Sequence, residues 1–364
     1  MESDALILLE QLVNIDSGTG DLEGMKKIAG IIEEKTRNMN GIFETLVAGD
    51  GSQHYLFRRG QGKKILLIAH LDTVFSKGTV YNRPFSMEGD VARGPGVSDC
   101  KSGVVTILEA LRNLNLGRWP NYEIYSFFNT DEEISSPGSR EFIRKLAQDA
   151  EMVLVVEPSE GENLTVARKG IGRFLLQVYG KSAHSGSNYQ DGCNAILEIA
   201  HQIIAIQNLT DLTEEITLNP GVVSGGTRPN IVPDYAELDI DLRVKSPGQV
   251  EKIITALTTI ASRNTIPGTY SKIKGEMTRP PLVATPENLK LYEKFKKIGL
   301  SLGIDLGLLE SGGGSDANLV AELGVPTIDG LGPVGGGHHS EAEYMSVPGL
   351  TQRIQLLTHF LKEL

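Results

Sequence analysis

The chain has 364 residues, more than a single hydrophobic core usually serves, so we expect two domains. Hydrophobic residues make up 40% and charged residues 22% of the sequence, which is typical of a soluble globular protein. The formal net charge of -11 argues against a nucleic-acid partner, which would need a basic surface. This charge also fits a protein that gathers carboxylates around cations.

The sequence gives no sign of secretion or membrane insertion. Its two cysteines, Cys100 and Cys193, are too few for a disulfide framework. The N-terminal stretch MESDALILLEQLVNIDS lacks the basic start and the cleavage site of a signal peptide. No apolar run approaches the roughly 20 residues that a membrane-spanning helix needs. We therefore expect a cytoplasmic protein without a membrane partner.

Helical and strand-like patterns alternate up to about residue 170. The expected helices cover 3–15, 21–38, 102–114 and 139–148, and the clearest strands cover 64–69, 122–128 and 152–156. Such alternation is typical of a parallel sheet with helices on its faces.

The rhythm changes between residues 172 and 276. In order, the patterns predict a strand in GRFLLQVYG, a helix in NAILEIAHQIIAIQ, strands in EEITLNPGVVSG and YAELDIDLRV, a helix in PGQVEKIITALTTIASR and a strand in TYSKIKGEM. This β-α-β-β-α-β order is that of a ferredoxin-like unit. After the joint TRPPLVATPEN, a helix in LKLYEKFKKIGLSLG, a short strand in VPTIDG and a helix over 347–363 resume the first pattern. We therefore predict one domain from 1–171 and 284–364, interrupted by a second over 172–283.

Carboxylates and imidazoles follow the predicted strands of the first domain. They are His70 and Asp72 after ILLIA, Asp131, Glu132 and Glu133 after YEIYSFFN, Glu157 after MVLVV, Asp99 in the loop RGPGVSDCKSG, and His338 and His339 in GLGPVGGGHHSEAEY. In open α/β sheets the ligand crevice lies outside the carboxyl ends of the strands. We therefore expect these side chains to share one edge of the sheet.

Each of these residues also has an ordinary structural explanation. Asp99 could cap a helix, Glu132 and Glu133 could form a solvated turn, and Glu157 could be an edge charge. Together, however, several buried like charges would cost several kcal/mol each without a counterion. Mixed imidazole and carboxylate ligands suit zinc or a similar ion better than calcium. The surplus of ligands suggests two ions, with Asp99 as the bridging carboxylate.

Eight motifs occur together in a familiar order. They are HLD, GPGVSDCKSG, NTDEE, VVEPS, GKSAHSG, GGTRPNIVPDYAELDIDLR, GGGSDAN and HHSEAEY. In these motifs the chain resembles the co-catalytic zinc peptidases of the aminoacylase and carboxypeptidase G group, peptidase family M20, and most of all its glutamate carboxypeptidases. The resemblance implies an α/β fold: a phosphorylase/hydrolase-like zinc-peptidase domain with a mixed, mainly parallel sheet, and an inserted ferredoxin-like dimerisation or lid domain.

The resemblance also implies roles for the polar residues. His70, Asp99 and Glu157 would hold one zinc ion, and Asp99, Glu133 and His339 the other, with Co²⁺ or Mn²⁺ as possible replacements. Asp72 would orient His70. Glu132 would be the general base that takes a proton from a metal-bridging water as it attacks an amide carbonyl.

Further residues of the motifs are implied to contact substrate. His184 would stabilise the oxyanion, usually across a dimer interface. Asn230 and Arg243 would contact the substrate, and Arg243 would bind the free carboxylate of the substrate. Backbone N–H groups of the SGGGSDAN loop, at Gly313 and Gly314, would approach the same carboxylate. Outside these motifs, a lone arginine at a strand end is more often in a salt bridge, and a histidine in a Ser/Gly loop is often only solvated.

Two departures from the group's pattern concern the metal ligands. Cys100 stands where many members have a second acid, and we expect little effect on metal binding. Because His338 and His339 are adjacent, either could be the metal ligand. We choose His339 because it directly precedes Ser340.

Three functions compete for this sequence. The leading hypothesis is a zinc exopeptidase that releases a C-terminal, acidic amino acid from a small peptide, a folate-like conjugate or an N-acyl amino acid. The alternatives are an N-acyl amino acid deacylase of the acetylornithine deacetylase or aminoacylase type, and a metal-binding paralogue without catalysis. Glu132 argues against the last, because loss of the base is the simplest route to inactivity. We expect a homodimer formed through the inserted domain.

Overall fold

The computed structural model describes residues 2–117 and 119–364, which divide into two compact units. The larger unit comprises residues 1–167, 284–311 and 315–364, and the inserted unit comprises residues 168–283 with 312–314. The division differs from the expected boundaries in two places. The inserted unit begins at Arg168 rather than at residue 172, and it includes the glycines of the SGGGSDAN loop.

A six-stranded sheet forms the centre of the larger unit, in the order β1-β2-β6-β3-β7-β16. Its strands are β1 (Ile42–Val47), β2 (Gln53–Gly60), β3 (Lys63–His70), β6 (Tyr122–Asn129), β7 (Ala150–Val155) and β16 (Thr327–Ile328). β6, β3, β7 and β16 run parallel, whereas β1 and β2 are antiparallel to their neighbours. The sheet is therefore mixed and mainly parallel, as the resemblance implies, whereas the residue patterns alone predict a parallel sheet.

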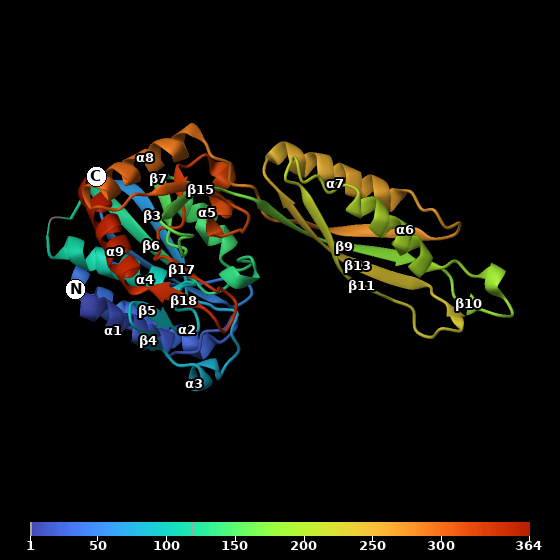
Figure 1. The fold of residues 1–364 in the computed structure, drawn as a ribbon, viewed down its shortest axis with the longest axis horizontal. Helices are drawn as coiled ribbons and strands as arrows, with labels where there is room; N and C mark the ends of the chain where they lie inside the picture. Colours follow the sequence, from blue (N-terminus) through green and yellow to red (C-terminus); the bar gives the residue numbers. More distant parts are fainter. Residues whose placement is uncertain (1, 118) are drawn as a thin grey trace. The chain divides into compact units, whose positions relative to one another are not determined.

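Helices cover both faces of this sheet (Figure 1). They are α1 (Glu2–Val13), α2 (Leu22–Thr36), α4 (Lys101–Asn115), α5 (Arg140–Ala147), α8 (Pro286–Ser301) and α9 (Val347–Lys362), with short helical turns α3 (Thr79–Asn82), η1 (Arg37–Met39), η2 (Glu132–Ile134) and η4 (Asp316–Leu323). Ile65, Leu67 and Ala69 of β3 pack into a core with residues of α1, α2, α4 and α9. Leu66 and Ile68 are also buried and point to the opposite face. Burial on both faces explains why β3 is an almost uninterrupted apolar run.

Smaller strand pairs complete the larger unit. A four-stranded sheet has the order β17-β18-β5-β4, from Gly335–Gly336, Tyr344–Ser346, Val91–Arg93 and Ser86–Glu88, and β8 (Asn163–Arg168) pairs with β15 (Gly307–Ser311). β18 pairs with β5, so the segment that follows His339 is held beside the chain that leads into the Asp99 loop. Among the described residues, no helix is long and apolar enough to cross a membrane.

The inserted unit is a four-stranded antiparallel sheet with two helices on the same face (Figure 1). Its main elements are β9 (Gly170–Tyr179), α6 (Ala195–Gln207), β11 (Thr217–Gly225), β13 (Tyr235–Val244), α7 (Pro247–Ser262) and β14 (Tyr270–Arg279), with β10 (Ala183–His184), η3 (Tyr189–Asp191) and β12 (Ile231–Val232) beside them. The strand order β11-β13-β9-β14 is that of a ferredoxin-like unit. Buried residues of β9 and β13 alternate with solvent-facing ones and pack against α6 and α7 in a separate core.

Several helices begin where the sequence provides a hydroxyl cap followed by proline. Ser246 accepts a hydrogen bond from the backbone of Gln249 before α7, and Thr285 accepts one from Asn288 before α8. A proline occupies the first turn of both helices, where its missing N–H has no partner to lose.

Candidate active site

His70 is the last residue of β3, and its imidazole is buried at the carboxyl end of the sheet. Its Nδ1 lies 2.9 Å from the backbone carbonyl of Asp72, which makes Nδ1 the donor. In the neutral ring, this leaves the lone pair on Nε2. That atom lies 2.9 Å from Oδ1 of Asp99 and 3.7 Å from Oε2 of Glu157. The ring therefore presents a metal-binding nitrogen to two carboxylates.

Asp99 lies between two histidines. It ends the loop before α4, and its carboxylate directs Oδ1 toward His70 and Oδ2 toward His339. The distance from Oδ2 to Nε2 of His339 is 3.4 Å. Nε2 of His339 also lies 3.1 Å from Oε2 of Glu133. Two ligand groups thus meet at one carboxylate, which is the arrangement that a bridging carboxylate requires.

The distances among these atoms fit divalent metals such as zinc. Ligands about 2.0 to 2.2 Å from a tetrahedral ion are separated from one another by roughly 3.3 Å. The nitrogen-to-oxygen distances in this cluster run from 2.9 to 3.7 Å. His70, Asp99 and Glu133 each offer one ligand atom, and these atoms lie within 4.8 Å of one another, close enough to hold one metal ion. The five sequence-predicted ligands therefore lie in one cluster, with both imidazoles offering Nε2.

His338 and His339 point to different partners. Nε2 of His338 lies 3.1 Å from the hydroxyl of Ser98, whereas His339 faces Asp99 and Glu133. The backbone of His339 has φ of 61°, in the left-handed region that non-glycine residues seldom adopt. This turn separates the two rings, and only the second reaches the carboxylate cluster.

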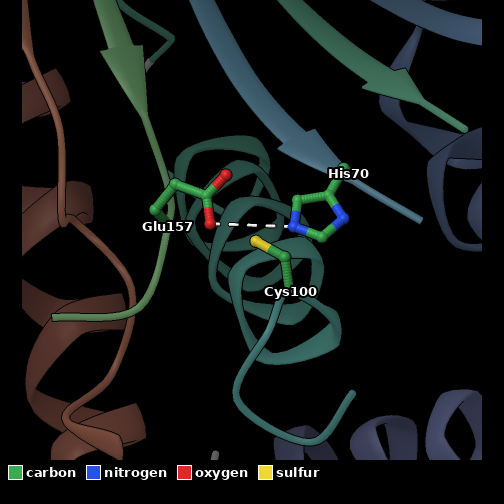
Figure 2. Close-up of side chains that lie close together, drawn as sticks. All are labelled: His70, Cys100 and Glu157. Carbon is green, nitrogen blue, oxygen red and sulfur yellow. Dashed lines mark ion pairs between the residues drawn. The ribbon is translucent and has the colours of Figure 1, made fainter. Parts of the chain in front are cut away.

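Cys100 adds a thiol to the His70 side of the cluster (Figure 2). Its Sγ lies within 4.8 Å of a ligand atom of His70 and of one of Glu157, and all three side chains are buried. The thiol donates a hydrogen bond to the carbonyl of Val156, 3.1 Å away. Burial and the neighbouring Glu157 raise the pKa of Cys100 well above its ordinary value. The group is therefore held as a neutral thiol beside the expected ligands.

The metal-free cluster perturbs the acidity of its members. Burial raises the pKa of Glu133 to about 8 and also raises that of Glu157. Burial would lower the pKa of His70, but the Glu157 carboxylate and other neighbours outweigh it and raise this pKa. The hydrogen bond to Asp99 raises the pKa of His339 to about 9. Without a metal, protons relieve the repulsion among these carboxylates.

Asp72 joins the end of β3 to the turn η2. Its Oδ1 accepts the backbone N–H of Glu132 and its Oδ2 that of Glu133, each at 3.1 Å. The hydroxyl of Thr19 donates to Oδ2 at 2.8 Å, and Oδ1 lies 3.3 Å from Nδ1 of His70. One fully buried carboxylate therefore orients His70 and also fixes the backbone of Glu132 and Glu133.

Asp131, the remaining acid of the NTDEE motif, turns away from the cluster. Its carboxylate accepts the backbone N–H of Gly138 at 2.6 Å and that of Ser139 at 3.1 Å, and it also accepts the Ser139 hydroxyl. Asp131 therefore closes the loop that follows η2, a role that its position at a strand end does not reveal.

His184 and Asn230 lie together in the inserted unit. Their segments pair as β10 and β12, and the carbonyl of Asn230 accepts the N–H of Ser185 at 3.1 Å. Nδ1 of His184 accepts backbone N–H groups of Gly186 and Ser187 at 3.1 and 3.0 Å. The proton of the neutral ring is therefore on Nε2, and the side chain is solvent-exposed. His184 is thus prepared to donate a hydrogen bond through Nε2.

The fork of Arg243 already has a carboxylate partner. Its Nε and one terminal nitrogen donate to the two oxygens of Asp241 at 3.0 and 3.3 Å, and Arg173 also pairs with Asp241. Asp241 and Arg243 are two residues apart on β13 and share one face, whereas Arg173 meets Asp241 through the pairing of β9 with β13, which the sequence pattern does not show. A substrate carboxylate at Arg243 would have to share the guanidinium with Asp241.

Gly313 and Gly314 lie beside two buried arginines that sequence reasoning also missed. Arg168 donates to the carbonyl of Gly313 at 3.3 Å. A Cβ at Gly314 would lie 2.8 Å from Cδ of Arg279 and 2.5 Å from Cδ1 of Ile171, so both side chains would have to shift to admit a larger residue. The close approach of backbone and arginine side chains explains the glycine at this position.

An open groove of about 630 Å³ adjoins Glu133 in the larger unit. It is lined by residues 18–21 and 73–77 with Glu133 and Ile134. Val74 and Ile134 expose apolar side chains there, at 44% and 57%. The groove offers room for part of a substrate directly beside the carboxylate cluster.

Comparison with known sequences identifies the family. The family model described as Peptidase family M20/M25/M40 matches residues 66–363. Carboxypeptidase G2 of Pseudomonas sp. (strain RS-16) is 34% identical, and the match covers 98% of this chain and 88% of that protein. Acetylornithine deacetylase of Aliivibrio salmonicida is 33% identical over 53% of this chain and 54% of its own.

Solved structures agree on the fold. A tripeptidase from Staphylococcus aureus superposes with a TM-score of 0.85 at 23% identity, covering 100% of this chain and 98% of that chain. An M20 family metallo-carboxypeptidase from Sulfolobus solfataricus gives a TM-score of 0.76 at 17% identity, covering 99% and 98%. The chain therefore belongs to peptidase family M20/M25/M40 and is a hydrolase.

Proposed function

We propose that this protein is a two-metal exopeptidase that hydrolyses the amide bond before a C-terminal amino acid, with an acidic residue as the expected product. The observation that carries the proposal is the carboxylate of Asp99, which offers one oxygen to the His70 side of the cluster and the other to the His339 side. The likeness to carboxypeptidase G2 over nearly the whole chain supports the carboxypeptidase assignment.

His70, Asp99 and Glu157 would hold one divalent ion, and Asp99, Glu133 and His339 the other. Zinc suits this set of imidazole and carboxylate ligands, and Co²⁺ or Mn²⁺ could replace it. When bound, such ions polarise an amide carbonyl and make a coordinated water more acidic. The chain's own contribution is to place the ligands and to move the proton.

Glu132 is the proposed general base. It precedes the ligand Glu133 in η2, and its backbone is fixed by Asp72. Glu132 is half-buried and adjacent in sequence to the proposed ligand Glu133, and its carboxylate is proposed to take the proton of the attacking water and pass it to the leaving nitrogen. Because Asp72 holds both Glu132 and Glu133, the base and the ligand keep a fixed relation to each other.

His184 is the proposed donor to the oxyanion. Its Nδ1 is engaged by two backbone N–H groups, so Nε2–H is the atom available to an oxygen that gains negative charge. Asn230, which directly precedes the paired strand β12, is the proposed second polar contact. Both belong to the inserted unit, so their proposed role requires that this unit approach the metal-binding cluster of the same or another chain.

The free carboxylate of the substrate is proposed to bind in the inserted unit. Arg243 is the predicted partner, with backbone N–H groups of Gly313 and Gly314 nearby in the proposed complex. The pairing of Arg243 with Asp241 sets a condition, because the substrate must compete with an existing carboxylate. The groove beside Glu133 would then receive the acyl side of the substrate, a small peptide or an N-acyl group.

An N-acyl amino acid deacylase is the second candidate. The chain is 33% identical to an acetylornithine deacetylase over about half its length, and the proposed chemistry is the same. The two functions differ only in which acyl group the enzyme accepts, so a substrate screen separates them.

A homodimer through the inserted unit is part of the proposal. β11 is an edge strand of the sheet, and its Val222 and Val223 are more than half exposed. On α6, Leu197 and Ile204 are also exposed. An edge strand with adjoining apolar side chains is a surface that soluble proteins usually cover.

The function is tested by a hydrolysis screen over dipeptides and N-acyl amino acids, with zinc, cobalt or manganese added to metal-free protein. Glu132→Gln is the matched variant because it keeps size and hydrogen bonding but removes the base. It should bind both ions and lose about 10²- to 10⁴-fold in kcat on the best substrate. Elemental analysis of metal-replete protein should give two ions per chain.

Three results would contradict the proposal. Saturation at one ion per chain would rule out the bridged pair. Full activity of Glu132→Gln would show that another residue is the general base. Binding of both ions with no hydrolysis of any peptide or N-acyl amino acid would favour the non-catalytic paralogue.

A further inference from the structure

Glu343 is a buried acid that sequence reasoning did not single out. It directly precedes β18, and only 1% of its surface is exposed. Its Oε1 accepts the backbone N–H groups of Ser98 and Asp99 at 2.9 and 3.0 Å, and its Oε2 accepts that of Gly96 at 2.9 Å. One side chain from near the C-terminal end of the chain therefore binds three backbone donors of the Asp99 loop.

The Asp99 loop that Glu343 binds is held by few backbone hydrogen bonds of its own in the described residues. Residues 94–100 lie between β5 and α4, outside regular helix and strand. Within the loop, the N–H of Lys101 donates to the carbonyl of Gly96, and that of Val97 to Gly94. Hydrogen bonds from backbone N–H groups to an ionised carboxylate are stronger than those between neutral groups. Glu343 is therefore positioned to determine the loop's shape.

Lys101 places a buried amine near this acid. Its side chain is buried, and Nζ donates to the carbonyl of Ile15 at 2.8 Å. Burial lowers the pKa of Lys101 to about 7, and the Glu343 carboxylate acts in the opposite direction. The three backbone N–H donors are therefore the main compensation for the loss of water around the buried acid.

We propose that Glu343 is a positioning residue for the carboxylate of Asp99. By fixing the N–H groups of Ser98 and Asp99, it holds the Asp99 backbone where one carboxylate oxygen faces His70 and the other faces His339. The inference rests on the proposed bridging role of Asp99. Because Asp99 is shared by both proposed metal positions, displacement of its backbone should weaken both ions together.

The test replaces the carboxylate with its amide. Glu343→Gln keeps one acceptor oxygen, but its NH₂ group must face at least one of the three backbone N–H groups. Glu341→Gln is the matched control, because Glu341 is two residues earlier in the same segment and is exposed. Glu343→Asp keeps the charge but is shorter by one methylene, and it should be affected less than Glu343→Gln.

Metal affinity is the main measurement, made on metal-free proteins by competition with a chelator for Zn²⁺ and Co²⁺ at fixed pH. Residues that support metal ligands typically contribute about 10- to 100-fold to affinity, so both ions should bind Glu343→Gln more weakly by that factor. Glu341→Gln should match the parent. The Co²⁺ absorption spectrum of Glu343→Gln should also change, because the geometry of the ligand set differs.

Thermal unfolding of the metal-free proteins separates positioning from general stability. A merely structural role predicts a lower Tm for Glu343→Gln with unchanged affinity and Co²⁺ spectrum in the folded protein, and that result would overturn the inference. If Glu343→Gln does not fold, Glu343→Asp carries the test, and parental affinity for both ions would overturn the inference equally. Failure of the parent to bind two ions would instead contradict the proposed function.

Discussion

At the scale of single residues, His338 and His339 show how neighbours in sequence take different roles. The His339 ring faces Asp99 and Glu133. In the described part of the chain, the hydrogen bond of the His338 ring is to the Ser98 hydroxyl. We predict that His339→Ala weakens metal binding by more than about 100-fold, since even supporting residues account for about 10- to 100-fold. His338→Ala should stay within about tenfold of the parent.

Elemental analysis after dialysis, with activity on the best substrate, checks this pair. The reverse order of the two variants would move the ligand by one residue.

The perturbed acidity of Glu133 and His339 predicts a pH dependence of metal binding. In the metal-free protein these groups have pKa values raised to about 8 and about 9, so at pH 7 they retain protons that a metal must displace. Both must lose a proton to act as ligands, so affinity should fall as pH decreases from about 9 to 7. Binding at pH 7 should therefore release about two protons per chain from these groups.

Calorimetry in buffers of different ionisation enthalpy measures that proton release directly. Affinity independent of pH over this interval would show that the metal does not displace these protons. Glu109 serves as an internal comparison. Burial away from the cluster raises its pKa, so protonation of Glu109 should leave metal binding unchanged.

The sequence could predict that the five proposed ligands gather at one edge of the sheet, because each follows a strand or lies in a tight loop, and the resemblance to the peptidase group chose them among the neighbouring acids and histidines. The partners of those ligands could not be predicted. Glu343 is 244 residues from Asp99, and their hydrogen bond depends on the pairing of β18 with β5. Likewise, the contact of Arg173 with the Asp241 carboxylate depends on the pairing of β9 with β13, which a motif does not specify.

At the scale of elements, Asp72 connects β3 to η2. Replacing it with asparagine puts an NH₂ group against one of two backbone N–H donors, so Asp72→Asn should displace either Glu132 or Glu133. We predict a loss of about 10- to 100-fold in kcat, with weaker metal binding. Thr19→Val is the matched control: it removes one donor to Asp72 but leaves both N–H bonds, and should cost less.

Steady-state kinetics and metal titration on the two variants test this connection. Equal effects of Asp72→Asn and Thr19→Val would mean that the N–H bonds to η2 are not what matters. A normal kcat in Asp72→Asn would contradict the proposed support of Glu132.

Elements with strong periodicity were predictable, and those formed by distant pairing were not. The predicted helix over 102–114 is observed as Lys101–Asn115, and the strand YAELDIDLRV as Tyr235–Val244. The short strands of the sheet β17-β18-β5-β4 have two or three residues each, too few for a periodic pattern. β16 is only Thr327–Ile328, because the rest of VPTIDG leaves the sheet.

At the scale of the whole molecule, His184 and Glu132 belong to different units. If His184 acts across a dimer, mixing His184→Ala with Glu132→Gln should restore activity in hybrid dimers. Random exchange gives half hybrids, each with one complete site, so about one quarter of parental activity is expected. The single variants, treated identically, are the controls.

Subunit exchange must be verified separately, for example by mass spectrometry of differently labelled chains. Complete exchange without recovery would favour a site completed within one chain. Analytical ultracentrifugation of Val222→Lys in β11 then asks whether that edge strand is needed for association, as proposed.

The division of the larger unit by an insertion affects how the chain is made on the ribosome. β16, His339, Glu343 and α9 all follow the inserted unit in sequence, yet they complete the sheet, the ligand cluster and the core built by the first 167 residues. Nascent chains grow at about 5 to 20 residues per second, so the N-terminal portion waits many seconds for these partners. During that interval the inserted unit, which is nearly continuous in sequence, can form its own core first. The proposed two-metal site can therefore form only after the inserted unit has been synthesised.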